Sequence, residues 1–270
     1  MTTPHNAAPT TAEQLKSCCA STYSQDAVAL LLGDSYHPGG LALTRRLAAR
    51  LALRPGTRVL DVASGRGGTA LLLAEEFGVQ ANGVDLSPAN VALARGAAAA
   101  RGLADRVGFV AGDAERLPYP DGSFDAVISE CAFCTFPDKP TAAAELARVL
   151  RAGGRLGLTD VTADPARLPE ELTGLAAWIA CVADARPLPE YTELLAAAGI
   201  RVRETERHDA AMTRMIDQIE ARLTVVQLTA RDRAQALGLD FDRAAPVLAA
   251  ARAAVADGAL GYALLVAEKA

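Results

Sequence analysis

The sequence predicts an α/β fold: a Rossmann-like, mostly parallel seven-stranded sheet with helices on both faces. Three observations predict it. Apolar runs of strand length alternate with segments of helical periodicity from about residue 58 onward. A glycine-rich turn at 64–68 joins the first apolar run to the first of these helices, and a second run ends at Asp85, an acidic residue placed as in nucleotide-binding sheets. Ligands of such sheets bind at the carboxyl ends of the strands.

The N-terminal part is predicted to cover this sheet. Residues 1–12 are expected to be disordered, and 13–270 are expected to form one domain, in which 13–54 are an N-terminal helical cover. The cover consists of helices at 12–32 and 41–53, the second of which ends before Pro55-Gly56.

The alternating part follows in order. Strands are expected at 58–62, 80–84, 107–111, 124–129 and 155–161, because each is a short apolar run. Helices with apolar faces are expected at 69–77, 88–101 and 140–150. Pro88 after the Ser87 cap suits the first turn of the second of these helices.

The C-terminal part is predicted to complete the sheet. Helices are expected at 168–183 and 189–198, followed by a sixth strand at 200–208. A helical insertion at 209–257, with helices at 212–237 and 244–256, precedes the last strand at 261–267. This insertion is expected to cover one side of the site.

Composition excludes several classes of function. With 270 residues, 51% of them hydrophobic, the chain can bury a full core. The net charge of −5 and the lack of basic clusters argue against a nucleic-acid partner. No apolar run approaches the roughly 20 residues of a membrane span, and the polar N-terminus lacks a signal pattern. We therefore expect a cytoplasmic protein, whose oligomeric state the sequence leaves open.

The glycine-rich turn lies within Asp61-Val-Ala-Ser-Gly-Arg-Gly67. A strand, a glycine turn and a helix can bind either a dinucleotide or S-adenosyl-L-methionine, since glycine lets the backbone approach a ligand closely. Asp61 would repel a pyrophosphate but suits the positively charged amino-acid end of S-adenosylmethionine. The acidic residue therefore favours the second cofactor.

Four ordered segments resemble the motifs of class I S-adenosylmethionine-dependent methyltransferases. They are Asp61–Gly67, Gly112–Pro118, Phe124–Ile128 and Leu150–Leu156, and together they span about a hundred residues. Ala63 stands where that family usually has its first glycine. The resemblance implies an enzyme that transfers a methyl group to a small molecule.

The resemblance also implies roles for individual residues. Asp61 would orient the methionine amine, and Asp85 would accept both ribose hydroxyls. Asp113 would bind the adenine amino group. The backbone of the turn would contact the methionine end through Ala63, Ser64, Gly65 and Gly67. Leu86 and Ala114 would lie beside adenine, and Ser129 and Glu130 would lie near the methyl group.

Five cysteines bear on the substrate: Cys18, Cys19, Cys131, Cys134 and Cys181. An odd number in a cytosolic protein does not indicate a disulfide framework. Cys134 is expected to be buried as a small apolar residue. The other four lie in the N-terminal cover, at the end of the fourth strand and in the segment after the fifth, so three regions can bring thiols together. Three thiolates suit a thiophilic element, and zinc is less favoured because no second pair accompanies Cys131-Ala-Phe-Cys134.

A closer resemblance is to the arsenite methyltransferases. It rests on Lys16-Ser-Cys-Cys19, on Ser129-Glu-Cys131 and on Cys181, and it spans roughly residues 15–185. Carried over, Cys131, Cys181 and either Cys18 or Cys19 would bind trivalent arsenic as a substrate, with a thiol reductant as a further partner. Glu130 stands where that family has asparagine.

Three functions remain open on the sequence alone. Arsenic held by thiolates keeps a lone pair and needs no base for in-line displacement of the methyl group. An organic acceptor, methylated on oxygen, nitrogen, carbon or sulfur, would often need a general base, for which Glu130, His37 and His208 are the candidates. A thiophilic-ion binding protein without turnover is disfavoured, because Asp61 and Asp85 are both in place.

Overall fold

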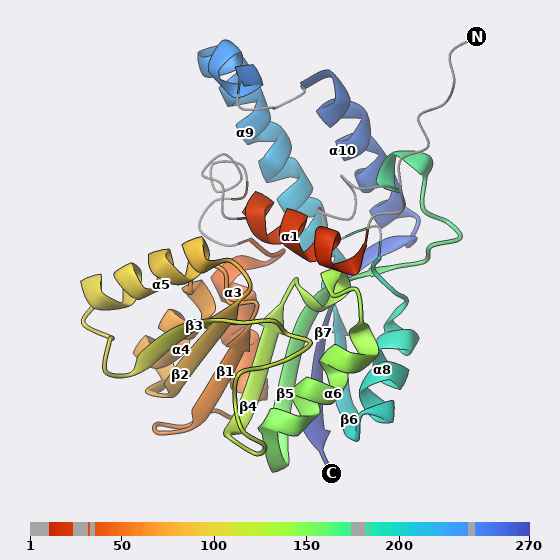
Figure 1. The fold of residues 1–270 in the computed structure, drawn as a ribbon. Coiled ribbons are helices and arrows are strands. Elements are labelled where there is room, and N and C mark those ends of the chain that lie inside the picture. Colours follow the sequence, from red (N-terminus) through yellow and green to blue (C-terminus); the bar gives the residue numbers. More distant parts are fainter. Residues whose placement is uncertain (1–10, 24–31, 33–35, 174–181, 183, 237–240) are drawn as a thin grey trace.

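A computed structural model describes residues 11–23, 32, 36–173, 182, 184–236 and 241–270 of the chain. One twisted sheet runs through the molecule, and helices pack on both of its faces (Figure 1). The strands are β1 (Arg58–Val62), β2 (Gln80–Asp85), β3 (Val107–Ala111), β4 (Phe124–Glu130), β5 (Leu150–Ala163), β6 (Ile200–Arg207) and β7 (Leu260–Lys269).

The strand order is β3-β2-β1-β4-β5-β7-β6. The first five strands pair in parallel, and β7 is antiparallel to both β5 and β6. After β1 the chain moves outward to β2 and β3 and then returns to the other side of β1 to form β4. This reversal creates a crevice at the carboxyl ends of β1 and β4, where ligands of open α/β sheets bind.

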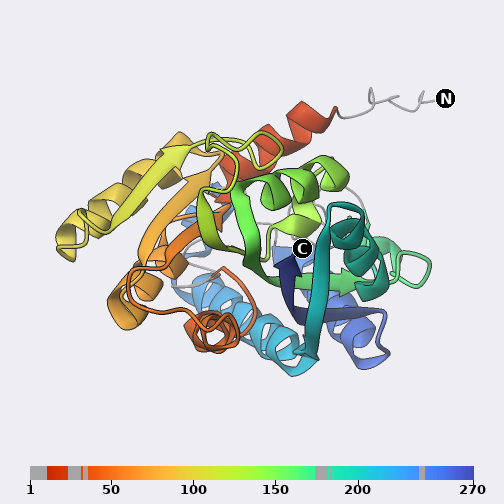
Figure 2. The ribbon, with the colours of Figure 1, turned by 90° about the horizontal axis from the view of Figure 1, so that it is seen from below.

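Helices cover each face of the sheet for a topological reason. Right-handed crossovers place helices on opposite faces when the strand order reverses. The helices of the alternating part are α3 (Gly40–Arg50), α4 (Gly68–Phe77), α5 (Pro88–Ala100), α6 (Lys139–Val149) and α8 (Leu188–Ala197). Figure 2 shows α3 on one side of the sheet and α6 with α8 on the other.

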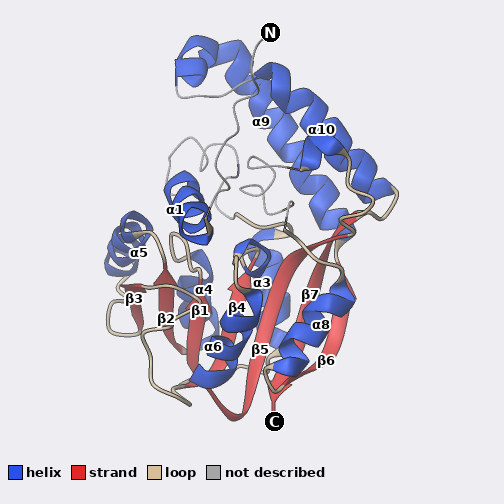
Figure 3. Ribbon diagram, turned by 45° about the vertical axis from the view of Figure 1, so that its right-hand side comes forward, coloured by secondary structure: helices blue, strands red, loops and turns tan. Residues whose placement is uncertain are grey.

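Three further helices lie at the carboxyl edge of the strands. α1 (Ala12–Tyr23) crosses above this edge, and α9 (Asp209–Ala236) and α10 (Phe241–Ala256) project beyond it (Figure 3). The long α9 packs its first turns near β7, while a small separate cluster of Leu223, Val226 and Phe241 joins α9 to α10. The cover and the insertion therefore flank the same edge of the sheet.

Aliphatic side chains from both faces form the core. Leu60 on β1 and Ile128 on β4 are fully buried at the centre of the sheet, and Leu47 of α3 packs on one face. Gly157 of β5 lies under α3, where an added Cβ would approach the Leu47 side chain to 2.9 Å. The glycine therefore allows α3 to pack closely against the strand that leads to the crevice.

The predicted fold class is confirmed, with the expected number of strands, the N-terminal cover and the insertion before the last strand. The boundaries of most elements agree within three residues. Two expectations need correction. β5 was expected to begin at residue 155 but begins at Leu150. The Gly153-Gly154 segment forms a bulge within the strand, between the pairs Phe124–Leu150 and Ala126–Arg155. A helix from residue 168 is wrong where the structure describes it, since Glu170–Leu172 form only a short 3-10 turn.

The first helix was expected at 12–32. Its described part, α1, runs from Ala12 to Tyr23, and residues 24–31 lie outside the described part of the chain, so the rest of this helix stays a prediction. Residues 1–10 and 174–181 also lie outside it, which leaves the expected disorder of the N-terminus and the helix around Cys181 as predictions. Among the described helices, none combines the length and the apolar character that crossing a membrane requires.

Candidate active site

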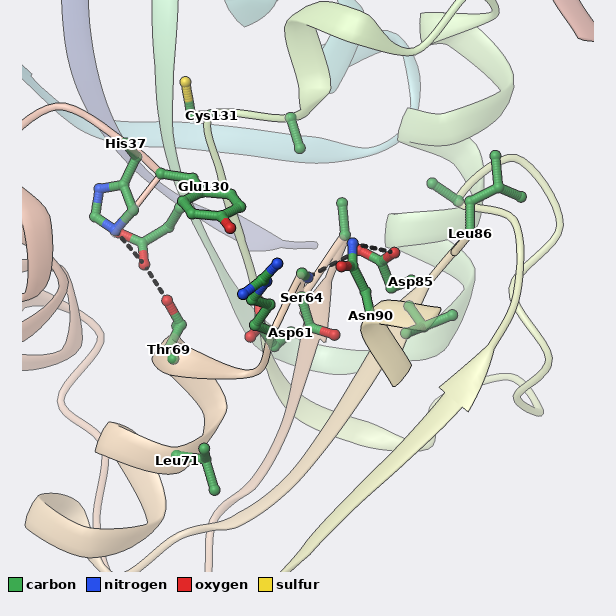
Figure 4. A pocket seen from close by; sticks show the side chains of 18 of the residues that line it. His37, Asp61, Ser64, Thr69, Leu71, Asp85, Leu86, Asn90, Glu130 and Cys131 are labelled. Atoms are coloured by element: carbon green, nitrogen blue, oxygen red, sulfur yellow. Dashed lines mark hydrogen bonds and ion pairs between the residues drawn. The ribbon is translucent and has the colours of Figure 1, made fainter. Parts of the chain in front are cut away.

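A cavity of about 760 Å³ opens at the carboxyl ends of β1, β2 and β4. Its walls come from α1, α3, the turn after β1, the ends of β2 and β4, and the turn after β3. Figure 4 shows His37 and Glu130 on one side of this cavity and Asp85 with Leu86 on the other. The cavity therefore lies in the crevice that the strand order creates.

The turn after β1 has an unusual backbone. Ala63, Gly65 and Gly67 all have positive φ angles, of 60°, 53° and 86°. A Cβ added at Gly65 would meet nothing within 4 Å, so the glycine leaves open space on the cavity side. Gly67 serves packing, since an added Cβ would lie 2.6 Å from Cζ of Phe109; it is not among the described residues that line the cavity.

Asp61 is the penultimate residue of β1, just before the glycine turn. Its side chain is 2% exposed and accepts a hydrogen bond from the Ala70 N–H at 3.2 Å. Burial raises the pKa of Asp61 well above its ordinary value, and the nearby carboxylates of Glu130 and Asp85 raise it further. A positively charged group bound beside Asp61 would offset all three contributions.

Asp85 ends β2 and is held by three donors. Its Oδ2 accepts from Gly65 N–H at 2.8 Å, and Oδ1 accepts from Ser87 N–H at 2.9 Å and from Asn90 Nδ2 at 3.2 Å. Burial raises the pKa of Asp85, and these donors oppose the rise. The carboxylate is thus fixed next to the glycine turn, where the sequence predicted the ribose contact.

The turn after β3 forms another part of the cavity wall. Asp113 and Ala114 line the cavity, as does Leu86, which is 39% exposed. Asp113 Oδ2 accepts a 2.8 Å hydrogen bond from Lys16 Nζ of α1, and Lys16 also pairs with Glu115. The N-terminal helix is therefore bonded to the residue expected to contact adenine.

The residues present fit S-adenosylmethionine. Ser64 Oγ and Asn90 Oδ1 are buried at the cavity wall, and no described residue hydrogen-bonds to either atom. Buried polar atoms of this kind normally have partners, so they indicate a polar ligand. The open space at Gly65, the Asp61 and Asp85 carboxylates and a volume within the range of small-molecule sites agree with this cofactor. When bound, it supplies an electrophilic methyl group on a sulfonium.

Glu130 follows β4 and receives hydroxyl groups from three elements. Thr44 of α3 and Thr69 of α4 donate to Oε2 at 2.9 and 2.6 Å, and Thr159 of β5 donates to Oε1 at 3.3 Å. His37 Nε2 lies 3.6 Å from Oε2, and both side chains are less than a tenth exposed. A carboxylate with several donors and an adjacent imidazole is an arrangement that can move a proton.

The cysteines divide into distinct environments. Cys131 has a φ of 54°, donates its N–H to the Thr159 carbonyl oxygen at 2.6 Å and lines the cavity. Cys19 of α1 lines the same cavity, whereas Cys18 is not among its described lining residues. Cys134 is buried in the core, and Cys181 lies outside the described residues.

Two other candidates lie away from the cavity. Ser129 is fully buried and donates to the Val62 carbonyl oxygen at 3.0 Å, which ties β4 to β1. His208, beyond the end of β6, lies 3.3 Å from Glu206. Among the described residues, no group of three or more histidines, cysteines or acids has an arrangement that could hold a metal ion.

Five residues that contact or line the site were not predicted from the sequence: Thr44, Thr69, Thr159, Asn90 and Tyr36. Thr69 and Asn90 had a usable signal, because each follows a predicted turn by a few residues. Thr44 had none, since its contact with Glu130 spans 86 residues.

Comparisons with known proteins agree with this geometry. Residues 60–158 match the family of the methyltransferase domain. They include the end of β1, the glycine turn, Asp85, Asp113 and Glu130, so the match covers much of the cavity wall. Residues 60–158 are therefore similar to a methyltransferase domain, and the cavity that they line fits S-adenosylmethionine.

Several relatives extend this match. The chain is 34% identical to methyltransferase GfsG of Streptomyces halstedii over 63% of its length and 62% of that protein. It is 36% identical to 27-O-demethylrifamycin SV methyltransferase of Amycolatopsis mediterranei over 61% of each. The chain thus spans about three fifths of the length of these curated relatives.

One solved structure is similar over nearly the whole chain. The [4+2]-cyclase SpnF is 29% identical, with a TM-score of 0.72 and coverage of 96% of this chain and 97% of that one. The arsenite methyltransferase of Halobacterium salinarum is 34% identical over 58% of this chain and 41% of its own length. The relatives therefore support a class I methyltransferase fold and domain, while their substrates differ.

Proposed function

We propose that the protein is an S-adenosylmethionine-dependent methyltransferase that methylates a hydroxyl group of a small organic molecule of the natural-product kind. One observation carries the choice of acceptor: the buried His37–Glu130 pair on the cavity wall, with Nε2 and Oε2 3.6 Å apart. A hydroxyl group must lose its proton as it takes up the methyl group, and this pair offers a place for that proton.

His37 would be the general base and Glu130 its partner. The Nδ1 atom of His37 lies 3.3 Å from the Pro38 carbonyl oxygen, so with a proton on Nδ1 the Nε2 atom carries the lone pair. Nε2 also lies 3.4 Å from Thr44 Oγ1, whose own proton goes to Glu130. A proton that moves from the acceptor hydroxyl to Nε2 would then face Glu130 Oε2. The three threonine hydroxyls hold that carboxylate in place during the transfer.

The same wall limits the acceptor chemically. Asp61 and Glu130 are both acidic and both line the cavity, so a negative charge next to the accepting oxygen would be repelled. Leu41, Ala132 and Phe136 supply apolar surface at the same cavity. A neutral alcohol or phenol on an apolar skeleton fits this combination, and one of the relatives described above is by name a methyltransferase of 27-O-demethylrifamycin SV.

A second candidate rests on the thiols. Cys19 and Cys131 come from different elements and line the same cavity, which favours trivalent arsenic as a substrate held by thiolates. Cys181 would be the third ligand and Cys18 the alternative to Cys19, with a thiol reductant supplying reduced arsenic. The similarity to an arsenite methyltransferase supports this candidate.

The experiment is an assay with isotopically labelled S-adenosylmethionine, in which products are detected by mass. Acceptors are hydroxylated polyketide fragments in one set and arsenite with glutathione in the other. His37→Asn should lower methylation of the alcohol by about 10²- to 10⁴-fold, the usual contribution of a general base, and should leave binding of S-adenosylhomocysteine intact. Cys131→Ser should leave methylation of the alcohol unchanged.

The reverse pattern would favour the metalloid: arsenite turnover that survives His37→Asn and disappears in Cys131→Ser. Because the similar structure SpnF is described as a cyclase, unlabelled products are analysed as well. Rearranged acceptor without label would contradict methyl transfer itself.

A further inference from the structure

α1 lies over the cavity without being part of the core. It crosses the carboxyl edge of the sheet in two views (Figures 1 and 3). None of its residues 12–21 is buried, and yet Lys16, Cys19 and Ala20 all line the cavity. The three residues that line the cavity are partly buried, so this side of α1 makes contacts with the rest of the protein.

Lys16 makes two ionic contacts at this face. Its Nζ lies 2.8 Å from Asp113 Oδ2 and also pairs with Glu115, and the three side chains are 17%, 31% and 12% exposed. Partly buried charged pairs that share hydrogen bonds are stronger than pairs on an open surface. The cluster therefore holds α1 against the turn after β3.

The cluster extends to a third segment. Glu115 Oε1 accepts a 2.9 Å hydrogen bond from the Asp138 N–H, and Asp138 caps α6 by accepting from Thr141 N–H at 3.0 Å. Lys16 and Glu115 thus connect α1, the turn after β3 and the start of α6, which surround one end of the cavity.

We propose that Lys16 is a cofactor-retaining residue, which keeps α1 closed over the adenine end of the cavity through Asp113 and Glu115. This inference rests on the cofactor site and is independent of the acceptor. Asp113 is the residue expected to bind the adenine amino group, and Lys16 neutralises the charge that Asp113 and Glu115 would otherwise share there. The bound molecule leaves at this end only after the Lys16 contacts break.

The hydrogen bonds with both acids raise the pKa of Lys16 despite its partial burial, so the ammonium stays charged across the neutral range. The closure should therefore depend on ionic strength and little on pH near neutrality. Salt screens partly exposed pairs of this kind.

The test measures the rate at which S-adenosylhomocysteine dissociates from the full-length protein. A fluorescently labelled S-adenosylhomocysteine is displaced by an excess of the unlabelled compound in a stopped-flow instrument, at low and at high salt. Lys16→Met should raise the dissociation rate by about three- to tenfold at low salt, as expected for a partly buried charged pair. The wild-type rate should rise with salt, and the Lys16→Met rate should change little. Lys16→Arg should remain near the wild type, because it keeps the charge.

Ser17→Ala is the matched control, since Ser17 is exposed on the same turn of α1. Glu115→Gln should give a smaller rise than Lys16→Met, because the pair with Asp113 remains. Equal dissociation rates in Lys16→Met and wild type, an equal rise in Ser17→Ala, or an unchanged salt dependence in Lys16→Met would each overturn the proposal. So would tighter binding by Lys16→Met, which would mean that Lys16 competes with adenine for Asp113.

Failure of the proposed function gives a different result. A protein that retains S-adenosylhomocysteine in a Lys16-dependent way but methylates no alcohol supports this inference and contradicts the choice of acceptor. A wild-type protein that does not bind S-adenosylhomocysteine overturns both.

Discussion

Thr69 Oγ1 donates a 2.6 Å hydrogen bond to Glu130 Oε2, and it does so from the first turn of the helix that follows the glycine motif. The cofactor motif and the acid at the opposite wall are therefore mechanically connected. Thr44, from α3, donates to the same oxygen at 2.9 Å. Glu130 is thus oriented by the two helices that flank the cavity.

Loss of one of these hydroxyls should reduce turnover without affecting cofactor binding. In Thr44→Val, Glu130 loses a donor, and we expect kcat to fall by about 10- to 100-fold, in line with one hydrogen bond to a charged group. Thr44→Ser should restore most of the rate. Steady-state kinetics with the best alcohol acceptor, together with S-adenosylhomocysteine binding by calorimetry, would measure both quantities. A fall in cofactor affinity equal to the fall in kcat would indicate a general structural effect instead.

The Asp61 carboxylate should lower the stability of the cofactor-free protein and raise its affinity for the cofactor. Burial and the nearby carboxylates raise its pKa, so the folded protein keeps a proton that the unfolded chain has lost. The cofactor-free protein should therefore lose stability as pH rises from the ordinary aspartate pKa to the raised folded value. Each unit of the rise corresponds to about 1.4 kcal/mol.

Asp61→Asn removes this penalty. We expect the cofactor-free variant to be more stable than wild type, with a difference that is larger near pH 8 than near pH 5 in urea unfolding. Its affinity for S-adenosylmethionine should be lower, because the positively charged amine loses its partner. A variant that is less stable than wild type at both pH values would contradict this account of Asp61.

The sequence was informative where function depends on neighbouring residues of the chain. The strand–turn–helix around Asp61 and the acid at Asp85 were predictable, because buried strands and glycine turns have local patterns. Ala63 was identified as a departure from the family, but its positive φ became visible only in the structure.

The contacts that complete the site depend on tertiary packing. Thr44 reaches Glu130 across 86 residues and Lys16 reaches Asp113 across 97, and no periodicity encodes either distance. Ser129 was predicted to be near the methyl group from its position after the fourth strand. Its side chain points to Val62 instead, because successive residues of a strand face opposite sides of the sheet.

Asp85→Ala should weaken cofactor binding by about 10- to 100-fold, the loss expected when a carboxylate bonded to two hydroxyls is removed. The cause would be loss of the acceptor for the ribose and loss of the bond from Gly65 N–H at 2.8 Å, which fixes the turn. Asp105→Ala is a suitable control, since Asp105 is exposed in the turn before β3. Isothermal titration with S-adenosylhomocysteine measures the change. An unchanged dissociation constant would remove Asp85 from the cofactor site.

Ala63→Gly should stabilise the protein. Ala63 has a φ of 60°, a left-handed conformation that costs an alanine about 1 kcal/mol or more and a glycine almost nothing. We expect a gain of about 0.5–1 kcal/mol in the free energy of unfolding, measured with urea, after allowance for the greater freedom of glycine in the unfolded chain. Ala92→Gly, at an exposed position inside α5, should have the opposite sign and cost a similar amount. If both variants lost stability equally, the strain at Ala63 would be compensated by its packing against the core, and the family's preference for glycine at this turn would have to come from the ligand.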